Sequence, residues 1–199
     1  MALLEIAIAA YQRPRLLTTL LWSLASQTSR DFQISVWHDG ASPEILNCIE
    51  HFQKLNEDIS ISYCFTQIRH NDYGHSLRSL AIDHCQTEFM LLTNDDNYYV
   101  PIFVEQIVEQ PLKDLDIVFF DMVHSHKLLS LPNTSGYQTL VTQPRINWID
   151  IGAFVFRTEL GKQTGFKSRD FAADGVFFES MLRDGARCLK IEKVLFVHN

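Results

Sequence analysis

Strand-like and helix-like segments alternate along most of this chain, and that alternation constrains the fold more than any other feature. Short apolar or alternating runs, which are typical of strands, stand at residues 6–9, 32–36, 59–65, 89–92, 116–120, 151–157 and 189–197. Helical patterns begin near Pro14, Ser42, Gly74, Pro101 and Ala172. Strands that alternate with helices build β-α-β units around a parallel sheet. The sequence therefore predicts an α/β fold, with a mostly parallel central sheet flanked by helices.

Local signals support these boundaries. Ser42-Pro43-Glu44 combines a preferred N-cap residue, a proline for the first helical position and an acid in the first turn. Residues 89–92 are continuously apolar, which is typical of a strand covered on both faces. The pattern weakens between residues 123 and 147, and a long loop inside a compact domain is often a functional lid or binding loop.

Length and charge narrow the class of protein. A chain of 199 residues fits one domain, and we assign residues 1–199 to it. The net charge of −7 argues against a sequence-tolerant nucleic-acid binder, which needs a broad basic surface. The four cysteines are dispersed and form no Cys-x-x-Cys pair, which favours free thiols in a reducing compartment. Without a secretory signal or an apolar run near ~20 residues, we expect a cytoplasmic protein with no transmembrane segment. Peripheral contact with the inner face of a membrane stays open.

Polar residues follow several of the predicted strands at the point where each strand ends. These groups are Ala10-Tyr11 with Arg13, then Asp39-Gly40, then Asn94-Asp95-Asp96, and finally His198. In open α/β sheets, ligands bind outside the carboxyl ends of the strands. The sequence thus places a candidate site at that edge of the sheet.

Asp95 and Asp96 directly follow the apolar run and are the first candidates for chemistry. Adjacent carboxylates repel each other unless a cation or hydrogen bonds relieve them. Mn²⁺ and Mg²⁺ take oxygen ligands, and commonly combine one or two carboxylates with substrate phosphates. The alternative interpretation is an Asp-rich turn that caps the next helix.

Four further residues have both a chemical and a structural interpretation. Asp39 can accept a hydrogen bond from a nucleobase ring, or belong to an Asp-Gly turn. Arg78 suits a phosphate oxygen, or a solvated helix face. Asp174, at a helix start, can act as a general base on an acceptor hydroxyl, or as a capping residue. His198 can bind a metal, or simply end a strand.

Several segments recur in an order and spacing that match one known family. They are Ile6 to Pro14 with its Tyr11-Gln12-Arg13 turn, Leu24 to Thr28, Asp31 to Ile34, Trp37-His38-Asp39-Gly40-Ala41-Ser42, Gly74 to Arg78, Asn94-Asp95-Asp96, the segment around Asp174 with Phe178-Glu179, and Phe196-Val197-His198. Together they resemble the inverting glycosyltransferases of family 2, which have the GT-A (Rossmann-like) fold. The resemblance covers essentially the whole chain.

The resemblance implies a metal-dependent transfer of a sugar from a nucleotide-diphosphate donor, a UDP-sugar by default, to the hydroxyl of a saccharide or other acceptor. It assigns donor binding to Ala10, Tyr11, Arg13, Asp39, Arg78, Asn94 and Asp95. It assigns Mn²⁺ or Mg²⁺ to Asp96 first, Asp95 second, and His198. It makes Asp174 the catalytic base of a hexosyltransferase-type enzyme. Residues 1–100 would form the nucleotide-binding half and residues 101–199 the acceptor-side half.

Two departures from the family pattern keep other functions open. Asn94 stands in place of the leading acid of the Asp-x-Asp triplet, and Ala173 in place of a Glu. A non-catalytic nucleotide-sugar-binding or scaffold protein on a degenerate GT-A fold is the first alternative. A sugar nucleotidyltransferase is the second, although the turn after the first strand lacks the glycines of such enzymes.

Overall fold

The computed structural model describes residues 2–125 and 136–199, and within them one nine-stranded sheet forms the centre of the molecule. The strands are β1 (Leu4–Ala10), β2 (Phe32–His38), β3 (Ile61–Phe65), β4 (Phe89–Asn94), β5 (Tyr98–Tyr99), β6 (Ile117–His124), β7 (Gln138–Leu140), β8 (Phe154–Arg157) and β9 (Cys188–His198). Their order is β3-β2-β1-β4-β8-β6-β9-β5, with β7 paired to β6. β1, β2, β3, β4, β6 and β9 run in one direction, and β5, β7 and β8 run in the other. The prediction of an α/β fold with a mostly parallel sheet is confirmed.

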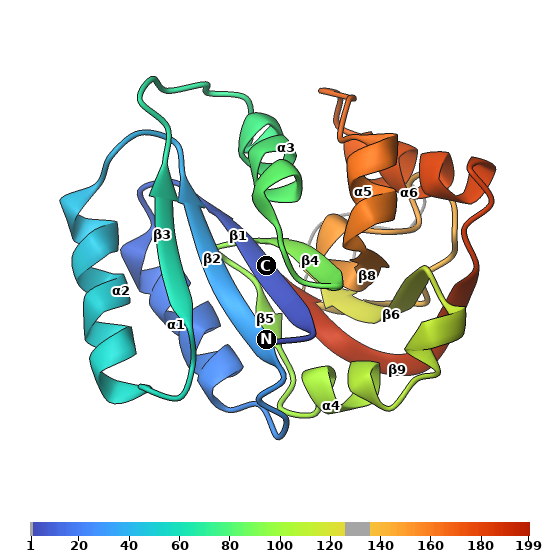
Figure 1. Ribbon diagram of the computed structural model, residues 1–199, viewed down its shortest axis with the longest axis horizontal. Coiled ribbons are helices and arrows are strands. Elements are labelled where there is room, and N and C mark those ends of the chain that lie inside the picture. Colours follow the sequence, from blue (N-terminus) through green and yellow to red (C-terminus); the bar gives the residue numbers. More distant parts are fainter. Residues whose placement is uncertain (1, 126–135) are drawn as a thin grey trace.

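Helices cover the sheet, as Figure 1 shows. They are α1 (Pro14–Ala25), α2 (Pro43–Leu55), α3 (His75–His84), α4 (Phe103–Val108), α5 (Thr158–Thr164) and α6 (Ala173–Arg183), with short 3₁₀ turns at Leu112–Asp114 and Ile151–Ala153. The helix α1 packs against α2 and lies behind β2 and β3 in Figure 1. The helix α3 packs on β1 and β2 and also contacts α5. None of the described helices is both long and apolar enough to cross a bilayer.

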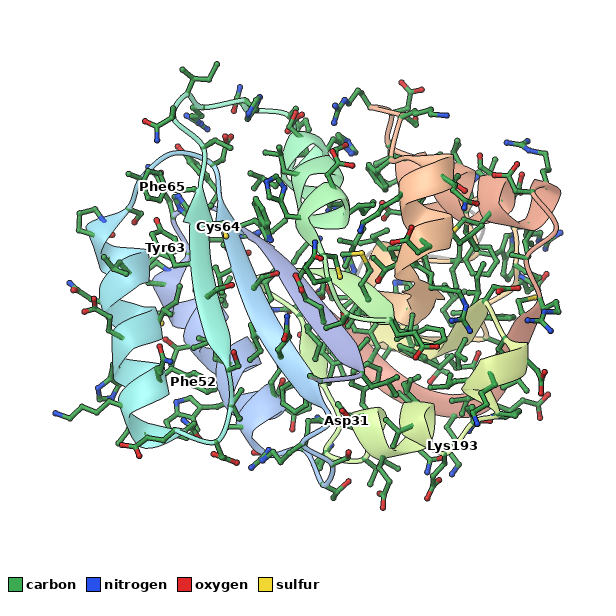
Figure 2. All side chains as sticks on the ribbon, viewed as in Figure 1. Asp31, Phe52, Tyr63, Cys64, Phe65 and Lys193 are labelled. Carbon is green, nitrogen blue, oxygen red and sulfur yellow. The ribbon has the colours of Figure 1, made fainter. Side chains whose placement is uncertain are left out.

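The capping signals in the sequence act as predicted. The hydroxyl of Ser42 accepts a hydrogen bond from the Ile45 backbone N–H, and Pro43 opens α2. Pro14 likewise occupies the first position of α1. Figure 2 shows Phe52 on α2 and Tyr63, Cys64 and Phe65 along β3, the outermost strand at this side of the sheet.

A cluster of aromatic rings fills the core behind the end of β4. Tyr99 is fully buried, and its hydroxyl hydrogen-bonds to Thr93 Oγ1 at 3.0 Å and to the Gly152 carbonyl at 2.9 Å. Its ring lies 4.6 Å from the ring of Phe103 and 5.2 Å from that of Phe196. A Cβ added at Gly152 would stand 2.6 Å from the Phe196 ring, so this position requires glycine. The cluster fixes β4, the 3₁₀ turn at Ile151 and β9 against one another.

The C-terminal half differs from its predicted elements. The run at 151–157, predicted as one strand, begins as a 3₁₀ turn and becomes β8 only at Phe154, because Asp150 caps the turn by accepting from the Gly152 N–H. The helix predicted from Pro101 begins at Phe103. The short elements β5, β7 and α5 were not predicted. Of the weakly patterned stretch at 123–147, β6 takes the first residues and β7 lies at 138–140, while residues 126–135 are outside the described residues.

Parallel pairing places the ends of three strands together. In the register of β1 with its neighbours, Ala10 lies opposite His38 of β2, and Ala9 lies opposite Asn94 of β4. The residues that follow these strands therefore leave the sheet at the same edge. This is the edge where the sequence predicts the site.

Candidate active site

The ends of β1, β2 and β4 are joined by backbone hydrogen bonds into one polar surface. The Asp95 N–H donates to the Ala9 carbonyl at 3.2 Å, and the Asp39 N–H donates to the Ala10 carbonyl at 3.4 Å. The Tyr11 N–H donates to Asp95 Oδ2 at 3.0 Å. The predicted groups around Tyr11, Asp39 and Asp95 are thus brought together.

Asp95 is fully buried and forms an ion pair with Arg13. The Arg13 guanidinium pairs with Asp95 Oδ1 and also with Asp96 Oδ2, and so bridges the two adjacent carboxylates. Burial raises the pKa of Asp95 to about 6, although the Arg13 charge and the Tyr11 N–H act to lower it. Each Asp95 oxygen thus already has a partner, and a metal ion bound there would share the carboxylate with Arg13.

Asp96 keeps one oxygen for another partner. Its Oδ2 pairs with Arg13, whereas its Oδ1 is buried and has no hydrogen-bond partner among the described residues. An unsatisfied buried carboxylate oxygen is costly, and in a native protein it calls for a water or an ion. Oxygen is the ligand that hard divalent cations prefer. Asp96 therefore fits a Mn²⁺ or Mg²⁺ ligand.

The three predicted metal ligands do not form an all-protein cage. Within residues 2–125 and 136–199, no three His, Cys, Asp or Glu side chains are gathered closely enough to hold a metal ion. Mg²⁺ is commonly bound by only one or two carboxylates that share it with substrate phosphates. A single carboxylate, that of Asp96, is enough for a cation that is shared with substrate phosphates in this way.

Arg78 is a buried cation that no anion of the described chain pairs with directly. Its side chain is 5% exposed, so the alternative of a solvated helix face is wrong. Its Nη2 donates to Asn94 Oδ1 at 2.7 Å and its Nη1 to the Tyr73 carbonyl at 3.1 Å, while its Nε is buried without a partner in the described chain. Asn94 is therefore held by Arg78. A guanidinium held by neutral groups suits a phosphate oxygen, as predicted from its residue type.

Asp39 holds the loop between β3 and α3. Its Oδ1 accepts from the His70 N–H at 2.7 Å and from Thr66 Oγ1 at 3.3 Å, and its Oδ2 accepts from the Asn71 N–H at 2.8 Å. The Asp-Gly turn is present, since Gly40 has a φ of +94°. Oδ2 retains capacity for a second donor, so the predicted contact with a nucleobase stays chemically open.

A stack of three planar groups lies beside Asp39. The Arg69 guanidinium lies 4.2 Å from the centre of the Tyr11 ring, and that ring stacks on His38 with centroids 5.7 Å apart. His38 Nε2 also accepts from the Gln12 N–H at 3.2 Å. Arg69 was not predicted from the sequence. Its only signal was a basic residue on a loop that leaves the carboxyl edge of the sheet.

Asp174, in the first turn of α6, has a partner outside its own helix. Its Oδ2 accepts from the Ile151 N–H at 3.3 Å, and the N-cap position is occupied by Ala172. Burial, and then the charge of Asp150, raise the pKa of Asp174 to about 6, while Arg78 acts to lower it. A shielded carboxylate with an elevated pKa is suited to accept a proton.

His198 lies against Asp150 at the end of β9. Its Nε2 is 3.6 Å from Asp150 Oδ2, and Asp150 Oδ1 accepts from the Gly152 N–H at 2.8 Å. In the register of β6 with β9, His198 stands opposite His124. Asp150 was not predicted from the sequence, because nothing in a single Asp before a strand reveals that the fold sets it beside Asp174 and His198.

Comparison with known proteins gives a consistent answer. The family model described as glycosyl transferase family 2 matches residues 5–174. Chondroitin synthase of Pasteurella multocida (strain Pm70) is 27% identical over 141 residues, which cover 69% of this chain and 14% of that protein. The chain thus spans a small part of this curated relative.

Solved structures share the fold. The S. aureus TarS fragment 1-349 superposes with a TM-score of 0.77 at 17% identity, over 100% of this chain and 60% of that one. The mannosyltransferase PcManGT from Pyrobaculum calidifontis, solved with GDP-Man and Mn²⁺, gives a TM-score of 0.72 at 15% identity, over 98% of this chain and 56% of that one. The chain spans 37% of the longer TarS structure. With the family model matched from β1 into α6, the chain belongs to glycosyl transferase family 2.

Proposed function

We propose that this protein is a metal-dependent, inverting hexosyltransferase that uses a nucleotide-diphosphate sugar, with a UDP-sugar as the default donor. One observation carries the proposal. Two groups near the end of β4 lack a partner of opposite charge or a hydrogen bond within the described chain. The buried Arg78 guanidinium, which bonds to Asn94, pairs directly with no anion, and the buried Oδ1 of Asp96 has no hydrogen-bond partner. A diphosphate with its divalent cation satisfies both groups at once.

The donor would bind along the edge formed by β1, β2 and β4, in the half of the chain up to about residue 100. Ala10 ends β1, Tyr11 and Arg13 follow it, and Asp39 follows β2, in positions suited to the nucleoside. Arg78 would neutralise a phosphate oxygen. Asp96 would hold Mn²⁺ or Mg²⁺, with Asp95 fixing Arg13 and the turn. When bound, the cation would stabilise the negative charge that grows on the leaving diphosphate.

The acceptor would approach from the half that carries Asp174. A carboxylate whose pKa is about 6 is ionised at neutral pH, yet is a stronger base than an exposed Asp. Asp174 would take the proton of the acceptor hydroxyl as that oxygen forms its bond to the anomeric carbon. In-line attack opposite the leaving diphosphate inverts the configuration. His198, predicted as a metal ligand, is held by Asp150 on this side of the site.

The relatives support the donor class. The TarS fragment has been solved with UDP and with UDP-GlcNAc, and the mannosyltransferase with GDP-Man and Mn²⁺. For this chain we propose a nucleotide-sugar donor, a saccharide or other hydroxyl acceptor, and a cytoplasmic location that keeps its four free cysteines reduced.

Thermal denaturation with UDP and with GDP, each with and without Mn²⁺, tests the proposal. Binding to the folded state raises the melting temperature. We expect one nucleotide to do so, and Mn²⁺ to increase the shift. Asp96→Asn should remove the Mn²⁺-dependent part, whereas the matched control Asp114→Asn, at an exposed carboxylate, should keep it. No shift with either nucleotide would contradict the donor assignment.

A non-catalytic role for the same fold has two observations in its favour. Ala173 precedes Asp174 where the family has a Glu, and Asn94 replaces an acid. A binding protein would show the nucleotide-dependent shift but release no free sugar from a UDP-sugar in the presence of Mn²⁺. Slow release that Asp96→Asn abolishes would support the enzyme.

A further inference from the structure

The three most exposed large apolar side chains of the described chain lie on two loops that contact each other. Phe171 is 101%, Tyr73 93% and Ile68 72% exposed, and no other large apolar residue among those described exceeds 58%. Ile68 and Tyr73 lie on the loop between β3 and α3, and Phe171 on the loop between α5 and α6. We call these three side chains the rim. Large exposed apolar groups in one place mark interaction surfaces.

The two loops form a single surface, because side chains clamp them together. Arg169 Nη1 lies 3.4 Å from Asp72 Oδ2, and the Phe166 ring stacks on His75 with centroids 5.7 Å apart. The Ser79 hydroxyl donates to the Phe166 carbonyl at 3.0 Å. In Figure 1 both loops reach the same upper edge of the molecule. Phe65, labelled at the upper end of β3 in Figure 2, adds a half-exposed ring on this side.

Cations surround the rim. Arg69, Lys167 and Arg169 are exposed on the same two loops, against the acids Asp72 and Asp170. Asp72 pairs with Arg169, which leaves Arg69 and Lys167 against Asp170. The two loops thus carry a net charge of +1, from three Lys or Arg and two Asp side chains, in a chain whose net charge is −7. Basic residues that alternate with protruding apolar ones are typical of proteins that lie on anionic membranes.

The high exposure of the rim side chains indicates the kind of partner they contact. A sugar ring or a peptide side chain binds in a concave site, whose walls are partly buried before the ligand arrives. Phe171 and Tyr73 are almost completely exposed, so their side chains have almost no contact with the rest of the described chain. Protruding apolar side chains bury the most area from water when they insert into the boundary between the headgroups and acyl chains of a lipid bilayer.

We propose that the rim docks this protein on an anionic lipid surface, with the carboxyl edge of the sheet facing the bilayer. Ile68, Tyr73 and Phe171 insert between the lipids, and Arg69, Lys167 and Arg169 contact the headgroups. The docking does not require the proposed transfer reaction. It would bring the site within reach of an acceptor carried by a lipid.

Co-sedimentation with vesicles tests this docking. The full chain is mixed with vesicles of phosphatidylcholine alone, or with one third phosphatidylglycerol. We expect binding to the anionic vesicles that weakens as salt is added. A triple variant, Ile68→Ala with Tyr73→Ala and Phe171→Ala, should reduce the partition coefficient at least about tenfold, because it removes most of the inserted apolar area.

A matched variant checks that the loss is specific to the rim. Leu55→Ala with Tyr137→Ala and Val141→Ala removes three other exposed apolar side chains and should bind vesicles as the parent chain does. The nucleotide-dependent melting shift of both variants separates this proposal from that of donor binding. The rim variant should retain the shift that the parent chain shows with UDP or with GDP.

A tryptophan introduced at the rim gives a direct signal. In Phe171→Trp, we expect an added emission that shifts to the blue on anionic vesicles and is quenched by brominated lipids, compared with the parent chain and its own tryptophans. Lack of vesicle binding by the parent chain, equal binding by both triple variants, or an added emission that does not shift in the Phe171→Trp variant would each overturn the proposal. So would a rim variant that keeps vesicle binding but loses binding of an oligosaccharide.

Discussion

Asp95 and Asp174 are both carboxylates whose pKa burial raises to about 6, yet they stand in opposite surroundings. Asp95 faces a cation, Arg13, and accepts from a backbone N–H, so each of its oxygens has a partner in the described chain. Asp174 has one long hydrogen bond from Ile151, and the charge that acts on it most strongly is that of Asp150, which has the same sign. The same shift in pKa therefore accompanies a structural role at one position and a proposed role in proton transfer at the other.

The difference teaches that burial is the largest cause of both shifts, whereas the sign of the neighbouring charge decides what the carboxylate can do. A cation that bridges two carboxylates fixes a turn and occupies the oxygens that a substrate proton would need. A second carboxylate raises proton affinity without blocking access. The following variants test this division, from the largest expected effect to the smallest.

Asp174→Asn should lower the rate of sugar transfer by about 10²–10⁴-fold, since general base catalysis contributes that range. Asn keeps the shape and can still accept from Ile151, so donor binding should change less than about threefold. Transfer to the acceptor and calorimetric titration of the nucleotide measure the two quantities. Full transfer activity in this variant would make the base assignment wrong.

The pH profile should show the pKa of Asp174 directly. The base works when ionised, so kcat should be constant above pH about 7 and fall about tenfold per pH unit well below pH 6. The donor concentration is kept saturating, so that a titration of Asp95 that weakens donor binding does not change the measured kcat. A fall that begins only near pH 4, the range of an ordinary Asp, would contradict the raised pKa.

Arg13→Gln should lower the free energy of unfolding by about 1–2 kcal/mol at pH 8, a range reduced because Arg13 is itself partly exposed. Without the cation, the folded-state pKa of Asp95 rises above 6. The loss should therefore shrink as the pH falls from 8 to 5, because Asp95 then becomes protonated in the folded state. Urea unfolding at both pH values measures it. Arg15→Gln, an exposed control two residues further along the chain, should have little effect at either pH.

Asp150→Asn should have the opposite effect on stability. It should raise the free energy of unfolding by about 0.5–1 kcal/mol at pH 8, because it removes the like charge beside Asp174. Asn can still accept from the Gly152 N–H and keep the 3₁₀ turn. The folded-state pKa of Asp174 should fall, so the acid limb of the kcat profile should move to lower pH. If the variant is less stable and the acid limb of its kcat profile does not move, then Asp150 does not raise the pKa of Asp174.

The sequence predicted the convergence of the strand ends better than the contacts of the C-terminal half, for a physical reason. The turns after β1, β2 and β4 follow directly from parallel strands in a regular β-α-β order, so Tyr11, Asp39 and Asp95 converge by topology alone. Asp150 and Arg69 gain their positions from a 3₁₀ turn and an irregular loop. Neither element has a periodic pattern that a sequence can reveal.

What the sequence by itself determined was the alternation of elements, the helix starts at Pro14 and Ser42, and the family, because these depend on local propensity and on motif order. Only the tertiary structure decided the partners. It set Arg13 across two carboxylates, buried Arg78 among neutral hydrogen-bond partners and left Asp96 Oδ1 unpaired within the described chain. It also brought Asp150 beside Asp174, and Phe171 onto the same rim as Tyr73. Such contacts join residues far apart in the chain, and their energies depend on burial that no local pattern specifies.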